Sequence, residues 1–302
     1  MWFRNLQIYR LTGPFPSDAE ALHEQLQGRA ARPCGSLEAA TIGWDTPLGR
    51  HGSQLTHAVG GCIMFCARRE ERLLPASVIR EALEEKVAAV EEREGRRVGR
   101  REKGELKEAI VQELLPRAFV KSSRLFAYLD TGNGWLLVDA ASARRAEELV
   151  TLLRETLGSL PLRPLEVAQA PASVMTAWLQ ESLPPAEFQL LGDCELRDPA
   201  DEKAVIRCTG QDLRGEEIGV HLQAGKQVVK VALEWHERLS LLLTDAFEIR
   251  RLRFLDVIQE QAADTAADDA ASRFDADFAL MSMELGRFLP RLIEQFGGIQ
   301  EG

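Results

Sequence analysis

The chain has 302 residues, of which 45% are hydrophobic and 28% charged, as is typical of a soluble globular protein. No apolar run approaches the ~20 residues of a membrane-spanning helix, and the N-terminus lacks the basic start and apolar block of a signal peptide, so we expect a cytoplasmic protein without a membrane segment. The net charge is −10, but ten acidic and only three basic side chains follow residue 253, so a local anion-binding surface is compatible with the acidic total.

The first part of the chain combines strand and helix patterns. Period-two alternation predicts a strand at 2–11, and a Ser/Asp cap signal predicts a helix at 16–28. Segments 40–49 and 57–70 are expected to be strands of one sheet. Pro75 and Gly95 fit the start and the end of a helix. A basic connector, 96–104, then leads to a second helix, 105–115, that should end near Pro116, so we expect a helical pair joined by basic residues.

The later segments predict a β-hairpin at 118–142, with Asn133-Gly134 in its turn, and an amphipathic helix at 142–160. After a Pro-rich connector, a helix is expected at 171–184 and antiparallel strands at 188–198, 203–213, 226–235 and 238–244. Residues 246–258 lead from strand to helix. A C-terminal helix, 268–298, carries an apolar stripe that should lie in the core or an interface: Phe274, Phe278, Met281, Leu285, Phe288, Leu289 and Leu292. Because strands and helix pairs are segregated, we expect an α+β fold with extended antiparallel sheets and flanking helices.

Catalytic and cofactor motifs are missing from the sequence. There is no Walker A, GxGxxG, GxSxG or HExxH pattern, and no histidine has a nameable Ser/Asp pairing. Cys62 and Cys66 should share one strand face, where a metal site with His51 and His57 competes with two buried thiols; the absence of CxxC-type spacing favours the thiols. We therefore expect no catalytic residue, no metal and no cofactor.

The stretch RRVGRREKGELKEAIVQELLPRAFVKSSR, residues 96–124, holds nine basic and four acidic side chains inside an acidic protein. Its basic residues are Arg96, Arg97, Arg100, Arg101, Lys103, Lys107, Arg117, Lys121 and Arg124. Three interpretations fit this charge: a solvated pair of helices held by ion pairs, a nucleic-acid-binding surface, or a surface for an acidic protein. Arginine offers planar donors suited to phosphate, but Lys121 and Arg124 should point to opposite sides of a strand.

The order of several segments resembles RdgC, a family of recombination-associated bacterial proteins, essentially from end to end. These segments are MWFRNLQIYRL, IGWDTPLG, LLPASVIREAL, EEREGRRVGRREKGELKEAIVQELLPRAF, VDAASARRAEELVTLLRETLGSLPLRPL, CTGQDL, KQVVKVALEW and RFDADFALMSMELGRFLPRLIEQFGG. The resemblance implies a non-enzymatic, nucleoid-associated protein that binds DNA with little sequence preference. It further implies a ring-shaped homodimer with a positively charged hole for duplex DNA, which limits access of the recombinase RecA.

This resemblance implies four regions. Residues 1–74 and 118–165 would form a central sheet region, 75–117 a helical gate with a basic connector, 166–235 a finger-like β-rich region, and 236–302 strands and a helix that return to the body. The gate arginines and lysines from Arg96 to Lys107 would face the hole, and Arg117, Lys121 and Arg124 would extend that surface. Phe119 would anchor the dimer contact at the gate; the competing interpretation is a core strand residue.

A second DNA-binding surface is expected from Gln211, Lys226, Gln227 and Lys230. Alternation along a strand would place Lys226, Val228 and Lys230 on one face, with the two lysines toward a phosphate backbone. The competing view is an edge strand whose lysines prevent aggregation.

Two other functions remain open. One is a regulator that acts mainly by binding RecA or another recombination protein directly, with DNA contact secondary. The other is a structure-specific nuclease, which would need a metal–carboxylate site that the spacing does not show. Double-stranded DNA is the expected partner; single-stranded DNA is a weaker candidate, because few aromatic residues interleave the basic ones.

Overall fold

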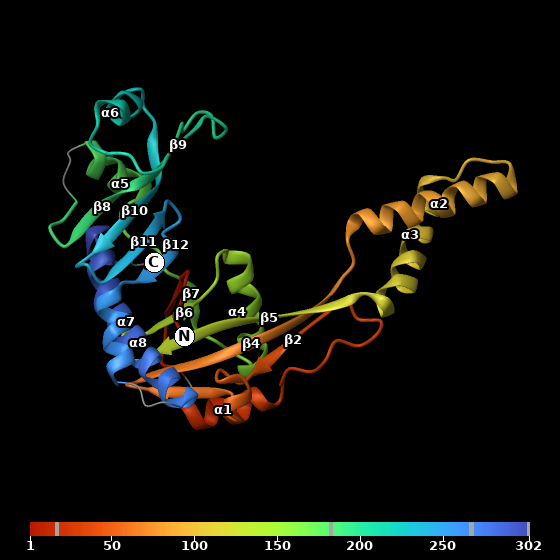
Figure 1. Ribbon diagram of the computed structural model, residues 1–302, viewed down its shortest axis with the longest axis horizontal. Helices are drawn as coiled ribbons and strands as arrows, with labels where there is room; N and C mark the ends of the chain where they lie inside the picture. The colour runs from red at the N-terminus through yellow and green to blue at the C-terminus, as the bar shows by residue number, and fades with distance from the viewer. Residues whose placement is uncertain (16–17, 181–183, 266–268, 301–302) are drawn as a thin grey trace.

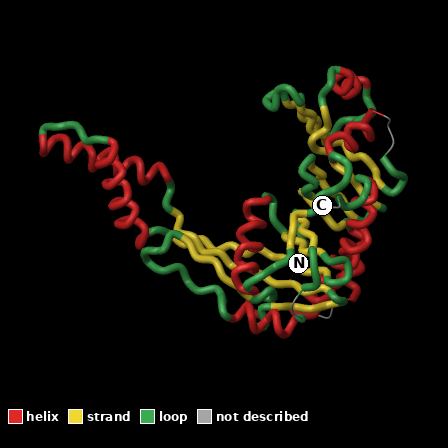
Figure 2. The backbone as a smooth tube through the Cα atoms, turned by 180° about the vertical axis from the view of Figure 1, so that it is seen from behind, coloured by secondary structure: helices red, strands yellow, loops and turns green. Residues whose placement is uncertain are grey.

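The computed structural model describes residues 1–15, 18–180, 184–265 and 269–300. The protomer is a curved, arc-shaped molecule with a projecting helical hairpin at one end and a separate small sheet at the other (Figure 1). The same curvature is seen from behind in Figure 2. The α+β class with antiparallel sheets and flanking helices is confirmed. Parts of three predicted helices, at residues 16–17, 181–183 and 268, lie outside the described residues.

The larger sheet has the order β2-β4-β5-β6-β1-β7, with β3 also paired to β4. Its strands are β1 (Gln7–Leu11), β2 (Ala40–Asp45), β3 (Thr56–Val59), β4 (Cys62–Leu73), β5 (Phe119–Asp130), β6 (Trp135–Val138) and β7 (Leu162–Pro164). All of its pairings are antiparallel. The strand β4 pairs with β5 along its whole length, from Cys62 opposite Asp130 to Leu73 opposite Phe119, and this long ribbon carries the helical hairpin.

The segment predicted as one strand at 57–70 forms a hairpin instead. Gly60 and Gly61 separate β3 from β4, and both have positive φ angles, 56° and 81°, which glycine adopts without a steric penalty. The Pro-rich connector also contains a short strand, β7, that pairs with β1. The predicted hairpin of β5 and β6 is confirmed, and Asn133-Gly134 lies in its turn.

Helices α1 (Ala19–Gln27) and α4 (Ala143–Leu157) cover one face of the larger sheet. Asp18 caps α1 by accepting hydrogen bonds from the backbone N–H groups of Glu20 and Ala21. The buried leucines of both helices pack against Phe65 and Trp44. A short 3-10 helix, η1 (Gly49–His51), follows β2.

The helical hairpin consists of α2 (Ala76–Glu94), α3 (Arg100–Leu114) and the 3-10 turn η2 (Leu115–Arg117). Gly95 ends α2 in the left-handed conformation, with φ 63°, as its position at the end of the apolar pattern predicted. The basic connector is shorter than expected, because α3 begins at Arg100 and not after Gly104. Arg100, Arg101 and Lys103 therefore lie on the first turn of a helix.

The smaller sheet has the order β12-β11-β10-β8-β9. Its strands are β8 (Phe188–Arg197), β9 (Val205–Cys208), β10 (Gln227–Trp235), β11 (Leu239–Thr244) and β12 (Ile249–Phe254). The helices around it are α5 (Pro171–Gln180), α6 (Glu216–Gln223), α7 (Asp256–Thr265) and α8 (Ala270–Gln295). Segment 214–225, which the sequence left unassigned, contains α6. The expected boundary between residues 235 and 236 falls inside this sheet, between β10 and β11.

One hydrophobic core joins the two sheets. It contains residues of β1, β4 and β5 together with residues of β8, β10, β11, α5 and α8. The apolar stripe of α8 lies in this core: Phe278, Met281, Leu285, Phe288, Leu289 and Leu292 are buried and Phe274 is half-buried. Helix α8 runs along the outer side of the bend between the sheets (Figure 1). The bend is therefore packed and holds the two ends of the arc apart.

Candidate nucleic-acid interface

The helical hairpin stands away from the body of the protein. Helix α2 has no buried residue, and α3 buries only Ile110. The two helices are held together locally: Val98 of the connector is buried, its N–H donates to Glu91 at 2.8 Å, and Lys86 pairs with Glu113 at 2.7 Å. Most of the hairpin surface is therefore exposed and available to a partner.

Three of the nine basic residues of segment 96–124 are already occupied by carboxylates. Arg96 pairs with Glu102 and Glu94, and the hydrogen bonds that its guanidinium donates to these carboxylates raise its pKa. Arg101 pairs with Glu105 one turn along α3, at 3.1 Å. Arg124 donates from its NH2 and Nε groups to Asp45, at 3.0 and 3.1 Å.

The other six basic residues are exposed and have no ion pair within the described residues. They are Arg97, Arg100, Lys103, Lys107, Arg117 and Lys121. Lys121 lies opposite Glu71 in the β4–β5 ribbon without forming an ion pair to it. Internal ion pairing thus accounts for only part of the charge of this segment, and the rest can bind an external anion.

Phe119 begins β5 directly after the hairpin, and 85% of its side chain is exposed. Its cross-strand partner Leu73 is also exposed, as are Val120 and Val78 nearby in the sequence. The alternative that Phe119 is a core strand residue is therefore excluded. An exposed aromatic ring beside an exposed leucine is a surface that a partner protein can cover.

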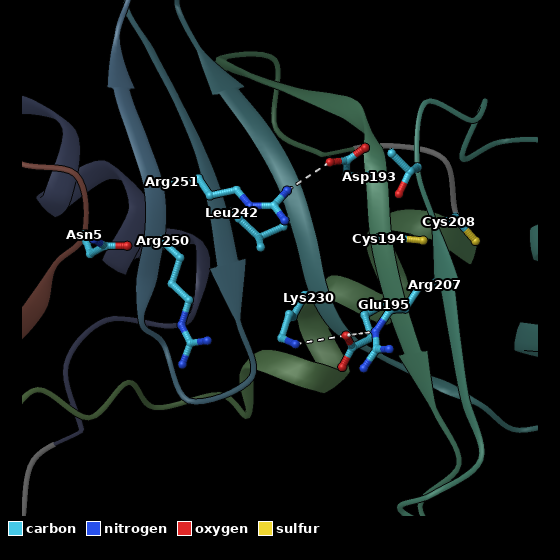
Figure 3. A pocket seen from close by; sticks show the side chains of 11 residues that line it. Asn5, Asp193, Cys194, Glu195, Arg207, Cys208, Lys230, Leu242, Arg250 and Arg251 are labelled. Carbon is cyan, nitrogen blue, oxygen red and sulfur yellow. Dashed lines mark hydrogen bonds and ion pairs between the residues drawn. The ribbon is translucent and has the colours of Figure 1, made fainter. Parts of the chain in front are cut away.

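The smaller sheet carries a row of charged side chains across three strands. Arg207 on β9 is opposite Glu195 on β8, which is opposite Lys230 on β10. Glu195 accepts hydrogen bonds from Lys230 at 2.9 Å and Arg207 at 3.0 Å, as Figure 3 shows. Burial raises the pKa of Glu195, but the hydrogen bonds and charges of Lys230 and Arg207 outweigh it and hold the pKa below its ordinary value.

The expected alternation of Lys226, Val228 and Lys230 is wrong. An irregularity in the pairing of β10 with β8 falls between Val228 and Lys230, and both Val228 and Val231 face the core. A bulge of this kind inserts one residue and reverses the faces that follow it. Lys230 consequently lies on the opposite face from Val228. The Lys226 side chain is mostly buried, and its Nζ lies 3.7 Å from Oδ2 of Asp198.

Gln211 and Gln227 are exposed but lie apart from this row of charges. Gln211 follows β9, and its backbone N–H donates to the Gly192 carbonyl at 3.0 Å. Gln227 begins β10 opposite Arg197. The part that projects from the sheet is the turn between β8 and β9, on the concave side of the arc (Figure 1), and neither glutamine is in that turn.

The sequence interpretation missed three arginines on this surface. Arg207 on β9 and Arg250 and Arg251 on β12 line a cavity of about 360 Å³ together with Lys230 on β10, as Figure 3 shows. Arg207 pairs with Glu195, and Arg250 pairs with Glu248. Arg251 pairs with Asp193. The basic run FEIRRLRF contains Arg250 and Arg251 and was the available signal for them, whereas Arg207 stands alone among apolar residues in KAVIRC.

The two candidate surfaces lie at opposite ends of the arc (Figures 1 and 2). A single protomer therefore does not bring them together. Over the described ranges, no group of three or more His, Cys, Asp or Glu side chains could hold a metal ion. None of the helices in the described part of the chain is long and apolar enough to span a membrane.

The geometry defines an α+β protein with free cations on a projecting hairpin and a mixed-charge surface on a second sheet. A family model described as "Putative exonuclease, RdgC" matches residues 1–299. A protein from Aeromonas hydrophila subsp. hydrophila, named "Recombination-associated protein RdgC", is 45% identical over 301 residues, which cover 100% of this chain and 99% of that protein. Proteins of the same name from Pseudomonas fluorescens and Pseudomonas aeruginosa are 44% and 46% identical over 299 residues, 99% of this chain and 98% of theirs.

The chain belongs to the RdgC family of recombination-associated proteins. The resemblance seen in the sequence is thus confirmed over the full length. The description of the family model names an exonuclease. The names of the relatives refer to recombination and do not name an enzymatic activity.

Proposed function

We propose that the protein binds double-stranded DNA without sequence preference. The observation that carries this proposal is the set of six exposed cations from Arg97 to Lys121, which form no ion pair among the described residues although the chain is acidic overall. Neutralising phosphates releases counterions from DNA, so such cations supply affinity that does not depend on the base sequence. The planar guanidinium groups of Arg97 and Arg100 suit phosphate oxygens.

The binding form in this proposal is a ring-shaped homodimer. Two copies related by a two-fold axis contact each other through the same surface on both partners. Two facing arcs would then meet hairpin to hairpin and small sheet to small sheet, and their concave sides would enclose the duplex. The exposed ring of Phe119 supports a contact at the hairpin end, because buried aromatic residues often dominate the energy of an interface.

A ring that covers DNA would limit the access of RecA and so modulate recombination. The names of the relatives support a role in recombination. Association with the nucleoid follows from the proposed DNA binding. Two experimental outcomes would replace this proposal. One is direct binding to RecA with DNA contact secondary, and the other is metal-dependent cleavage of DNA.

The decisive experiment is fluorescence anisotropy with two labelled duplexes of unrelated sequence and one single strand, titrated across a salt series. Similar affinities for both duplexes that fall linearly with salt on logarithmic axes are expected, and the slope gives the number of phosphates neutralised. An absence of binding at low salt would reject the proposal. If the protein bound no DNA but still captured RecA in a pull-down, the alternative of a regulator that acts by direct protein contact would be favoured.

Cleavage is tested separately with the same duplexes in the presence of Mg²⁺. An end-labelled duplex should stay intact during an incubation that saturates binding. Shortened products that disappear on chelation of the metal would support a nuclease, in line with the description of the family model.

A further inference from the structure

Two cysteines lie directly opposite each other on the smaller sheet. Cys194 on β8 is the register partner of Cys208 on β9, and both are free thiols. Both line the cavity beside Lys230 and Arg207, and Figure 3 shows them on neighbouring strands. The pair is not used by the proposed DNA-binding surface.

The positions satisfy the geometric requirement of a disulfide. Directly opposite residues of antiparallel strands have Cα atoms roughly 4.5 to 5.5 Å apart, and disulfides need Cα distances of about 4.4 to 6.8 Å. Cys62 and Cys66 provide the contrast within the same chain. They lie four residues apart on one strand, β4, which separates their Cα atoms by roughly 13 Å and makes a bond between them impossible.

We propose that Cys194 and Cys208 form a reversible disulfide by exchange with a small disulfide such as oxidised glutathione, and so make the edge of this sheet responsive to redox conditions. Cys208 is only partly buried, so its thiol is the one that a small disulfide can reach, whereas Cys194 is 4% exposed. Strand β9 is at the edge of the sheet, with β8 as its neighbour, so it can adjust to the new bond without displacing a further strand.

The exchange proceeds in two balanced steps. Cys208 is the more exposed thiol, and its thiolate attacks one sulfur of oxidised glutathione; the S–S bond breaks and one glutathione thiolate leaves. The Cys194 thiol then loses its proton and attacks the Cys208 sulfur, which releases the second glutathione. Two electrons pass from the cysteine pair to glutathione. The reverse reaction, with reduced glutathione or another thiol, restores both thiols.

The environment of Cys194 slows formation of the disulfide at neutral pH. Burial, followed by the charge and hydrogen bond of Cys208, raises the pKa of Cys194 to about 12. Since the thiolate is the attacking form, the second step is slow at neutral pH and becomes faster as the pH rises. The disulfide would close the chain from 194 to 208 and fix Arg207, which directly precedes Cys208, at the sheet edge.

The test uses the full-length protein, incubated with excess oxidised glutathione, unfolded in the presence of a thiol-alkylating reagent, digested and analysed by mass spectrometry. We expect a peptide pair joined through Cys194 and Cys208 that is lost on treatment with dithiothreitol. In the same digest, Cys62 and Cys66 should carry the alkyl group. The oxidised protein should run as a monomer on a non-reducing denaturing gel.

The matched variant is Cys194→Ser, in which the reaction should stop at a glutathione adduct on Cys208. The proposal would be overturned if the wild-type protein still carried only this adduct after prolonged incubation at raised pH, where the Cys194 thiolate forms more readily, because the Cys194 sulfur would then not reach Cys208. It would equally be overturned if both cysteines remained unmodified, or if the two were joined only between different molecules. Far-ultraviolet circular dichroism of the reduced and oxidised samples checks that the fold is unchanged.

Discussion

Glu195 on β8 and Lys230 on β10 form an ion pair of 2.9 Å across neighbouring strands, and Arg207 on β9 reaches the same carboxylate. One buried acidic side chain thus engages two of the basic residues of the smaller sheet. A guanidinium nitrogen of Arg197 also lies 3.4 Å from a carboxylate oxygen of Glu195. The cationic character of this surface depends on whether Glu195 keeps its charge.

Neutralising Glu195 should strengthen DNA binding. Glu195→Gln keeps the shape of the side chain but releases Lys230 and Arg207 for phosphates, so affinity should rise and the salt slope should steepen by about 1 for each additional phosphate contacted. Glu234→Gln is the control, because Glu234 is on the same strand as Lys230 and has no ion pair within the described residues. Anisotropy titrations compare the two variants. Equal slopes for both would show that the smaller sheet does not contact DNA.

Charge reversal on the hairpin should weaken DNA binding and flatten its salt dependence. Arg97→Glu and Arg100→Glu each remove an unpaired cation and place an anion near the phosphates, so each should lower the slope by about 1. Arg291→Glu makes the same change of charge on α8, at an exposed residue paired with Glu294. Its slope should match that of the wild type. If a hairpin variant showed the same salt slope as Arg291→Glu, the hairpin would not be the DNA-binding surface.

Phe119→Ala should weaken self-association without loss of fold. The ring is 85% exposed, so its removal should change the free energy of unfolding by less than about 0.5 kcal/mol. If Phe119 anchors a dimer contact, sedimentation velocity should show a rise in the dimer dissociation constant of about tenfold or more. Leu37→Ala removes another exposed apolar side chain, 71% exposed, and should leave the constant unchanged. An unchanged dimer dissociation constant for Phe119→Ala would show that this residue is not part of the interface.

The contact between Arg238 and Glu284 should be important for stability. Glu284 lies on α8 and is fully buried, and Arg238 donates to both of its carboxylate oxygens at 2.7 Å. Arg238→Ala would leave a buried carboxylate without its main partner, at a cost of about 3 kcal/mol in the free energy of unfolding. Arg291→Ala breaks an exposed pair on the same helix and should cost less than about 1 kcal/mol. Urea denaturation measures both, and equal midpoints would contradict this account.

The regular elements were largely predictable because their signals are local. Asp18 caps α1 and Gly95 ends α2 through interactions with the nearest turn. The apolar stripe of α8 repeats at helical spacing and is buried as expected. The β3–β4 hairpin was missed because an apolar run with two central glycines also fits a continuous strand. In the structure, the positive φ angles of Gly60 and Gly61 and the antiparallel pairing of β3 with β4 show that the chain turns there.

The candidate site was less predictable because it depends on pairing between distant segments. Arg124 meets Asp45 across strands far apart in the sequence, so its charge is occupied although it ends a basic run. Lys226 and Lys230 fit one face of a regular strand, but the irregularity after Val228 reverses that face. The opposition of Cys194 and Cys208 likewise follows from the register of β8 with β9 and from no spacing rule.

The sequence by itself determined the family, the α+β class, the helical hairpin and the concentration of basic residues beside it. Those features rest on the order of residues and on interactions within a few turns of the chain. The tertiary structure alone decided which cations are free, that Phe119 is exposed, and that the two cysteines face each other. Ion pairing and burial depend on which distant strands become neighbours, and a single inserted residue in a strand is enough to reverse the result.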